Sequence, residues 1–203
     1  IGLMFVPLLL NYLDAERYGI WLTLTSIVGW FTFFDAGLGN GLRNRLTEAL
    51  AKEDYQLAQE YVSTTYALIS SVFIGVLILF YCINPFLHWN EILNTSTIPE
   101  RELSLLALIV FTFFLLRFIF NLIGIILMAD QKPALNNAIN PIGNIVSIII
   151  IYILSFTMKG ALVMMGFVLS VIPVVVLLVT SFFLFRGKYR HLKPSIKSIN
   201  WKY

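Results

Sequence analysis

The fold of this chain is decided by one stretch, Leu103–Met128, which reads LSLLALIVFTFFLLRFIFNLIGIILM. A transmembrane helix needs about 20 consecutive, mostly apolar residues, and this stretch is long enough. The strands of a membrane β-barrel are instead about ten residues long and alternate in polarity. Runs such as Val146–Tyr152 and Val174–Val179 do not alternate, so the pattern predicts helices.

Five further apolar stretches are long enough to be whole or partial spans. They are Ile1–Leu13, Tyr18–Phe34, Tyr61–Asn84, Ala138–Phe156 and Ala161–Phe185. Of the 203 residues, 59% are hydrophobic and 12% charged, against roughly 45–50% and 25% in soluble domains. The sequence therefore predicts an all-α membrane protein. We expect a six-helix transmembrane bundle over residues 1–185, with its first helix truncated, and a basic cytoplasmic linker or tail over 186–203.

Lysine and arginine are distributed unevenly over the predicted loops, which sets the orientation. One side of the bundle holds Arg43, Arg45, Lys52, Lys132, Arg186, Lys188, Arg190, Lys193, Lys197 and Lys202. The other side holds Arg17, Arg101 and Lys159. Because cytoplasmic loops carry the excess of positive charge, we expect residues 186–203 in the cytoplasm. This tail could bind anionic lipid headgroups, but we favour a topology anchor or linker, and nothing indicates nucleic-acid binding.

The segment between the second and third spans has a helical pattern of its own. Leu42, Leu46, Ala49 and Leu50 recur at helical spacing. This spacing predicts an extension of the second helix that lies at the membrane interface. Asp54 follows, and its side chain is of the type that caps the start of the next helix.

Arg117 is the residue whose position costs the most free energy. It lies near the centre of Leu103–Met128, where insertion scales make an arginine roughly 2.5–3.5 kcal/mol unfavourable. Either an acidic residue of a neighbouring helix pairs with it, or it faces a water-filled cavity or an anionic substrate. Ionisable groups inside a membrane are functional by default, and Asn121 lies one turn later on the same face. We therefore predict that Arg117 and Asn121 bind substrate.

Two further polar features lie within predicted spans. One is a stripe on a single face of the fifth span, formed by Asn137, Asn140, Asn144 and Ser147. Such a stripe either lines an aqueous cavity, which makes Asn140 and Asn144 candidate substrate ligands, or forms hydrogen bonds between helices. The other is Asp35, at the end of the second span. It is a candidate proton or cation site, or the partner of Arg117 or Arg43.

No pattern typical of catalysis or metal binding is present in the sequence. Cys82 is the single cysteine, and His88 and His191 lie on opposite sides of the predicted membrane. The glycines at positions 37, 39 and 41 lack the spacing and the preceding strand of a dinucleotide fingerprint. We therefore predict a protein that is not an enzyme and has no cofactor or metal.

The stretch FDAGLGNGLRNRLTEA at Phe34–Ala49 resembles the second-helix signature of bacterial polysaccharide (O-antigen type, Wzx-like) flippases. These belong to the MOP superfamily, which also contains the MATE exporters. YVST at Tyr61–Thr64 and LMADQKPA at Leu127–Ala134 are similar to that branch as well. The resemblance implies two six-helix bundles facing each other across a central cavity in a bacterial cytoplasmic (inner) membrane. This chain would be most of the N-terminal bundle, and the missing C-terminal half would be its partner.

The resemblance further implies transport of polyprenyl-diphosphate-linked oligosaccharide across the bilayer by alternating access. Arg117 would then bind the diphosphate or an acidic sugar. Hydrogen bonds to sugar hydroxyls would come from Asn121, Asn140 and Asn144. Asp35 would form an ion pair, with Arg43 as a candidate partner, or couple transport to H+ or Na+. Two alternatives stay open: a MATE-like ion-coupled drug exporter, which a central arginine disfavours, and a non-transporting scaffold for glycan assembly.

Overall fold

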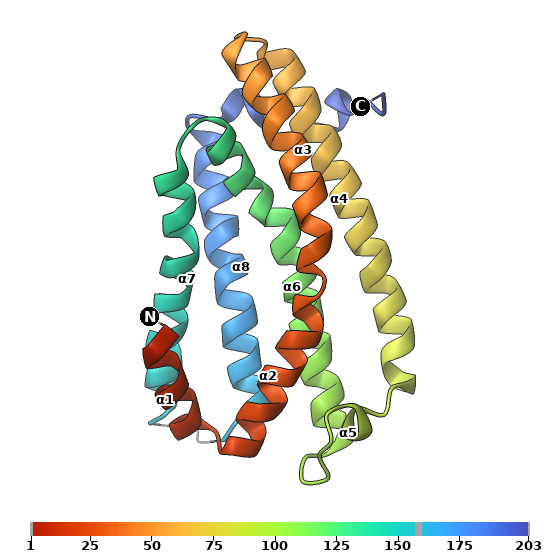
Figure 1. Cartoon of the computed structure of the whole chain (residues 1–203), viewed down its shortest axis with the longest axis vertical. Coiled ribbons are helices and arrows are strands. Elements are labelled where there is room, and N and C mark those ends of the chain that lie inside the picture. Colours follow the sequence, from red (N-terminus) through yellow and green to blue (C-terminus); the bar gives the residue numbers. More distant parts are fainter. Residues whose placement is uncertain (1, 157–159, 203) are drawn as a thin grey trace.

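The computed structural model describes residues 2–156 and 160–202, and for residues 2–5 and 32–38 it describes the backbone alone. The helices are α1 Gly2–Tyr12, α2 Ala15–Gly29, α3 Thr32–Ala51, α4 Tyr55–Ile83, α5 Trp89–Ile92, α6 Glu100–Ala129, α7 Pro133–Leu154 and α8 Leu162–Arg186 (Figure 1). Short 3₁₀ turns lie at Asn84–Phe86, Arg190–Leu192 and Ile196–Ser198. The described residues contain no strand, so the prediction of an all-α protein is confirmed.

Four helices of the described chain are long and apolar enough to cross a membrane: α4 with the turn after it, α6, α7 and α8. They confirm the third to sixth predicted spans. Neither of the first two predicted spans is a single helix long enough to cross a membrane. Helix α1 has 11 residues, and the second span is divided between α2, which has 15 residues, and the start of α3. The division falls at Trp30 and Phe31. Just before it, the hydroxyls of Thr25 and Ser26 donate to carbonyls of the preceding turn, and such bonds bend helices.

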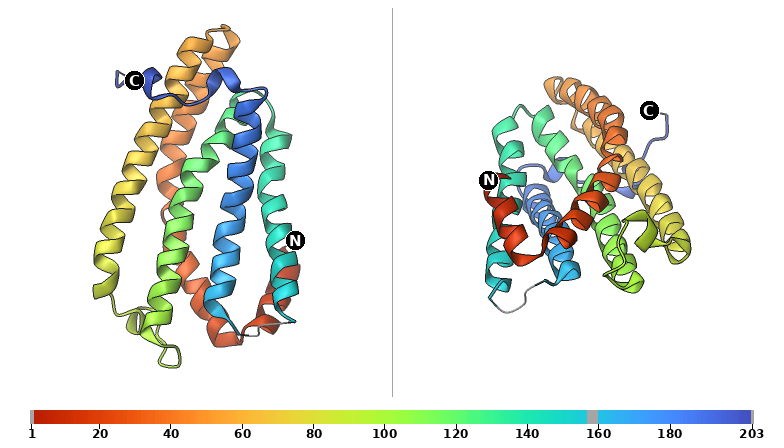
Figure 2. Two further views of the ribbon diagram at one scale, coloured as in Figure 1. Left: turned by 180° about the vertical axis from the view of Figure 1, so that it is seen from behind. Right: turned by 60° about the horizontal axis from the view of Figure 1, so that its bottom comes forward.

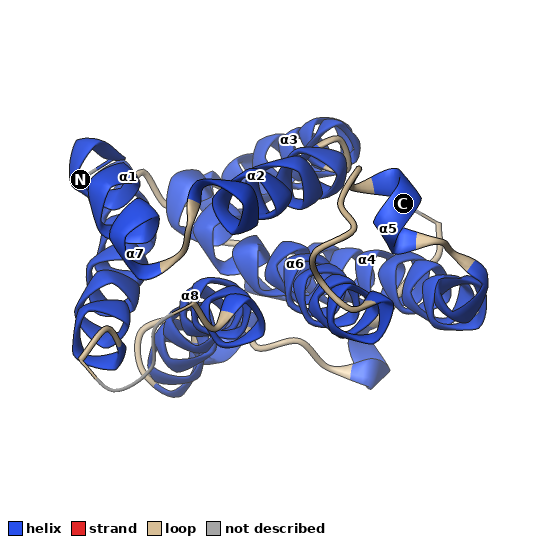
Figure 3. Ribbon diagram, turned by 90° about the horizontal axis from the view of Figure 1, so that it is seen from below, coloured by secondary structure: helices blue, strands red, loops and turns tan. Residues whose placement is uncertain are grey.

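Helix α6 lies in the middle of the bundle, and most of the other helices pack against it (Figure 3). The part of α6 from Leu115 to Leu127 shares one apolar cluster with α3 and α4. The part from Leu103 to Phe111 shares a second cluster with α1, α2 and the first turns of α8. One helix therefore runs through both halves of the core, and Arg117 lies close to where the two clusters meet.

Small residues set how closely α8 approaches its neighbours. A Cβ atom at Gly166 of α8 would lie 2.3 Å from Leu106 Cδ1 of α6. A Cβ atom at Gly143 of α7 would lie 3.3 Å from the Cα of Pro173 in α8. Small residues at such contacts let membrane helices pack with their backbones close together. The three helices α6, α7 and α8 therefore form the tightest part of the bundle.

The apolar pattern after the second predicted span belongs to α3, which forms an antiparallel hairpin with α4 (Figure 1). Leu42, Leu46 and Ala49 are buried in the cluster that α3 shares with α4 and α6. The apolar stripe of this segment therefore packs on helices and not on lipid, while its position at the membrane interface stays a prediction. The predicted cap is confirmed: Asp54 Oδ1 accepts a hydrogen bond from the backbone N–H of Leu57 at 3.0 Å.

After α8 the chain crosses one end of the bundle. This end also holds the α3–α4 and α6–α7 turns, and we call it the basic end because most lysines and arginines lie there. Residues 187–202, which we call the strap, run across the basic end and lie along the first turns of α4 (Figure 2). The boundary at residue 186 between a bundle and a linker stays a prediction, as does the placement of this end in the cytoplasm.

Candidate functional site

Arg117 places a guanidinium group at mid-depth in the bundle. Its Cα is about 26 Å along the helix axis from Glu100 and about 18 Å from Ala129, the two ends of α6. The Nη2 atom of Arg117 donates a hydrogen bond to Oδ1 of Asn140, on α7, at 2.8 Å. Among the side chains that the structure describes, no carboxylate pairs with it. A neutral amide is therefore the partner of this charge within the described part of the chain.

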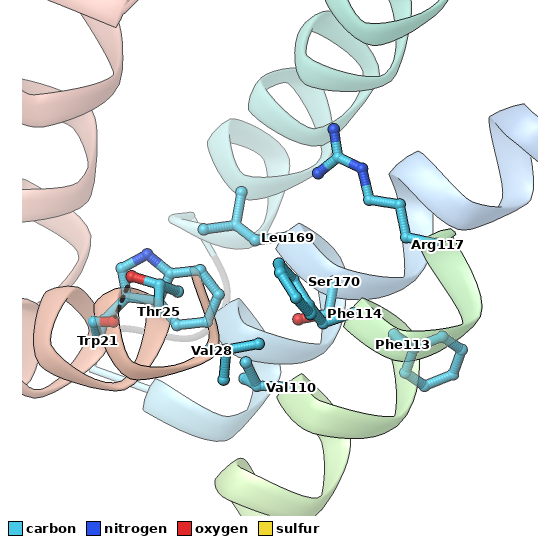
Figure 4. Close-up of a pocket in the computed structure, with 9 residues that line it drawn as sticks. All are labelled: Trp21, Thr25, Val28, Val110, Phe113, Phe114, Arg117, Leu169 and Ser170. Atoms are coloured by element: carbon cyan, nitrogen blue, oxygen red, sulfur yellow. Dashed lines mark hydrogen bonds between the residues drawn. The ribbon is translucent and has the colours of Figure 1, made fainter. Parts of the chain in front are cut away.

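A cavity of about 190 Å³ lies beside Arg117, between α2, α6 and α8 (Figure 4). It is lined by Trp21, Thr25, Val28, Val110, Phe113, Phe114, Arg117, Leu169 and Ser170. The guanidinium group extends away from the α6 backbone at the rim of this cavity, while Trp21 and Thr25 face it from α2. The Thr25 hydroxyl already donates to Trp21 O at 2.8 Å. Arg117 is the one charged residue among these lining residues.

The cavity can hold a small anion but not a large ligand. Its volume is below the roughly 300–1,000 Å³ of pockets that enclose drug-sized molecules. In so apolar a wall, the charge of Arg117 is weakly screened and attracts an anion more strongly than it would in water. The described residues contain no cluster of three His, Cys, Asp or Glu side chains that would hold a metal ion. What the site offers chemically is a single positive charge in a largely apolar wall.

The polar stripe on α7 is divided between the surface of that helix and its packed face. Asn140 is exposed, and its side chain accepts the hydrogen bond from Arg117. Asn144 is half-buried and forms no side-chain hydrogen bond among the described residues. Ser147 is fully buried, and its hydroxyl donates to Gly143 O at 2.9 Å. The structure therefore brings Asn140 to the arginine, whereas Ser147 is satisfied within its own helix.

Asn121 lies one turn after Arg117 on α6, but it is close to a different polar residue. A Cβ atom at Gly124 would lie 3.7 Å from Asn121 Oδ1 and 2.3 Å from Asn136 Oδ1. The side-chain oxygens of Asn121 and Asn136 therefore both lie near Gly124, close to the start of α7. Asn136 was not predicted as a site residue, because the sequence shows only that it lies next to the predicted polar stripe.

The predicted roles of Asp35 and Arg43 stay predictions. Both belong to α3, but the side chain of Asp35 lies outside the described residues. Arg43 is exposed and forms no ion pair in the described part of the chain. The two residues are eight positions apart on one continuous helix, about twice the spacing at which side chains pair along a helix. This spacing argues against a direct ion pair between them.

A second polar cluster surrounds Asp130, at the basic end of α6. Its carboxylate accepts hydrogen bonds from Lys188 Nζ at 2.7 Å and Tyr189 Oη at 2.6 Å, and Lys132 Nζ lies 3.2 Å away. Burial opposes ionisation of the carboxyl, but these donors outweigh it and lower the pKa of Asp130 to about 2. The hydrogen bond to Asp130 raises the pKa of Lys188. The cluster ties the α6–α7 turn to the start of the strap.

The cavity wall contains residues that sequence reasoning did not identify. Thr25 and Ser170 are hydroxyl residues within apolar spans, and Trp21 is an aromatic residue among many. A single hydroxyl in such a span is a weak signal, because it can bond to a carbonyl of its own helix. Only the packing of α2 and α8 beside α6 shows that these residues share a cavity with Arg117.

Comparison with known proteins shows a distant relationship. The chain is 27% identical over 144 residues to a Yersinia pseudotuberculosis protein described as "Putative O-antigen export protein". The matched region covers 71% of this chain and 32% of that protein, so the chain spans about a third of its relative's length. No family model and no solved structure matches the chain. These comparisons show no relationship to MATE exporters.

Proposed function

We propose that this chain is part of a transporter that moves a polyprenyl-diphosphate-linked oligosaccharide across a bacterial cytoplasmic membrane. Its membrane-spanning helices suit that role, and the name of the Yersinia relative refers to O-antigen export. The observation that carries the proposal is Arg117, a cation at mid-depth beside a cavity, with a neutral amide as its partner among the described side chains.

The guanidinium of Arg117 suits a diphosphate better than an ammonium group would. Its planar fork of N–H donors can bind two phosphate oxygens at once, whereas lysine offers a point charge. The bond to Asn140 uses one of five N–H donors. A phosphate can therefore accept bonds from the others while Asn140 orients the group. Asn140, Asn144 and Asn121 lie within a few turns of Arg117 and supply amides for sugar hydroxyls.

The volume of the cavity limits which part of the substrate it could hold. About 190 Å³ is enough for a phosphate group and a few waters, but not for an oligosaccharide. The diphosphate would therefore bind beside Arg117, and the glycan would lie outside this cavity. Alternating access, with Asp35 as a site for a coupling H+ or Na+, is the mechanism we propose.

Glycan display at the cell surface tests this proposal. In cells that depend on the full-length protein, Arg117→Gln should reduce surface glycan by about tenfold or more, because a hydrogen bond to a charged group contributes about 1.5–3 kcal/mol. Arg117→Lys should fall between this variant and the wild type. Arg101→Gln, an exposed change on the same helix, is the matched control and should leave display unchanged. Wild-type display by Arg117→Gln at an equal protein level would refute the proposal.

A non-transporting membrane scaffold is the second candidate. The hydrogen bond from Arg117 on α6 to Asn140 on α7 favours it, because such bonds also join helices that simply pack together. In a scaffold the polar face of α7 would be dry and would contact a partner protein. In a transporter the same face would be reached by water during the cycle.

A further inference from the structure

The strap, residues 187–202, is attached to α4 along its length. Six hydrogen bonds join it to α4 among the described residues. The shortest are Gln59 Nε2 to Lys193 O (2.9 Å), the N–H of Asn200 to Thr64 Oγ1 (2.9 Å) and the N–H of Ser195 to Ser63 Oγ (3.1 Å). Tyr189 and Leu192 anchor its first turn, at 2% and 0% exposure. The strap therefore has a defined position on the bundle.

Helix α4 shows the depth in the membrane at which the strap lies. Residues 61–83 of α4 carry no charged side chain. At 1.5 Å per residue this part of the helix is about 34 Å long, slightly longer than the roughly 30 Å of a bilayer's hydrocarbon core. The strap's partners Ser63 and Thr64 lie in its first turn, and Gln59 lies just before it, next to Glu60. The strap therefore lies at the boundary between lipid and water.

The outward side of the strap combines apolar side chains with positive charge. Ile196 is 88% exposed and Trp201 is 68% exposed, and tryptophan is enriched at membrane interfaces. Lys193, Lys197 and Lys202 are also exposed, and none of them forms an ion pair among the described residues. The strap contains no acidic residue. Such a surface at this depth is complementary to the headgroup layer of an anionic bilayer.

We propose that the strap is a binding site for anionic phospholipid headgroups at the basic end. Ile196 and Trp201 insert at the boundary of headgroups and acyl chains, and the three lysines bind lipid phosphates. A lysine near an anionic surface strengthens binding about fivefold. Because hydrogen bonds to α4 already order the strap, lipid binding avoids most of the entropy loss that a disordered tail would suffer. The site is independent of the substrate that the bundle carries.

A depth measurement tests where the outward side of the strap lies. A nitroxide label on Ile196→Cys, in a Cys82→Ser background in lipid nanodiscs, is compared with labels on Gln56→Cys and Val72→Cys. Gln56 is exposed at the start of α4, and Val72 is exposed within its apolar stretch. We expect the label at position 196 to lie at a depth between those of the two reference labels. It should lie deeper in nanodiscs that contain phosphatidylglycerol than in nanodiscs of phosphatidylcholine alone.

Two results would overturn the proposal. One is a label at position 196 that is as accessible to water as the label at Gln56. The other is a label that is protected from both oxygen and an aqueous nickel reagent, which would show that protein covers the strap.

A matched pair of charge variants tests the lysines. The first variant carries Lys193→Gln, Lys197→Gln and Lys202→Gln; the control carries Arg43→Gln, Arg45→Gln and Lys52→Gln, on the α3–α4 hairpin. The dissociation constant for phosphatidylglycerol, measured by native mass spectrometry, should rise on the order of 100-fold in the first variant. The control should change by less than about fivefold. Equal losses would indicate non-specific attraction, and no loss in the first variant would show that the strap is not the site; either result overturns the proposal.

Discussion

Replacing Arg117 with methionine tests whether the bundle keeps this charge for stability or for function. Methionine has a long side chain and a good helix propensity, but it removes the charge and the bond to Asn140. Insertion scales make an arginine in the membrane interior roughly 2.5–3.5 kcal/mol unfavourable, which is an upper limit for what its removal adds to folding, whereas a lost interhelical hydrogen bond costs about 0.6–1.7 kcal/mol. Arg117 is half-buried beside a cavity, so the lower end of the first range applies. We expect Arg117→Met to be about 1 kcal/mol more stable than wild type.

The assay is unfolding by SDS in mixed micelles, followed by tryptophan fluorescence. Leu116→Met is the matched control, since it changes a neighbouring half-buried position and keeps side-chain volume, at a cost under about 1.5 kcal/mol. Surface glycan display should be lost in Arg117→Met despite its higher stability. Destabilisation of Arg117→Met by more than about 1 kcal/mol would refute the reasoning, because it would show that the arginine is a structural residue.

Three further predictions concern other parts of the bundle. Because the folded-state pKa of Asp130 is about 2, below its ordinary value of 3.8, the stability it contributes should be complete above pH 4 and decline as the pH falls toward 2. Asp130→Asn should remove this acid-dependent part of the free energy of unfolding, which is about 1 kcal/mol after screening by solvent. SDS unfolding at several pH values measures it, and a variant with the same pH profile as the wild type would contradict the prediction. Gly166→Ala should lower the free energy of unfolding by about 1–3 kcal/mol, because the new methyl group meets Leu106. Gly75→Ala, where the new methyl group has open space, should raise it by about 0.5–1 kcal/mol. Similar unfolding curves for the two variants would show that α6 and α8 do not pack as described. Asn144→Cys, in a background without the native cysteine, should react with a water-soluble maleimide if α7 lines a transport path, and an inert thiol would favour the scaffold.

The spans could be predicted where apolar runs are long and uninterrupted. The run around Arg117 defines α6, and similar runs define α4, α7 and α8. The division of the second span at Trp30 and Phe31 was not predicted, because the hydroxyls before it bond to the backbone without disturbing the apolar pattern. The apolar stripe of Leu42, Leu46 and Ala49 was expected to face the membrane interface, but it packs on α4 and α6. An amphipathic stripe shows that a helix has one apolar face, but not whether lipid or protein covers it.

The candidate site could be predicted only in part. Arg117 was identified because a charge in an apolar span is costly whatever surrounds it. Asn140 and Asn144 were found from helical spacing, but the bond of Asn140 to Arg117 depends on how α7 is rotated against α6. The cavity, with Trp21 and Ser170 in its wall, needs three helices to be in place. The contacts of the strap on Ser63 and Thr64 join residues more than 130 positions apart, so no local pattern indicates them.

The sequence by itself determined that this chain is helical and spans a membrane, and that Arg117 must be accommodated within it. Those conclusions depend on transfer free energies, which belong to individual residues and add along the chain. Only the tertiary structure decided that Asn140 meets Arg117, that a cavity lies beside Arg117, and that the strap lies along α4. Contacts between helices depend on rotation, depth and close approach at residues such as Gly143 and Gly166. Hydrophobicity leaves these unspecified, because lipid is as apolar as a neighbouring helix.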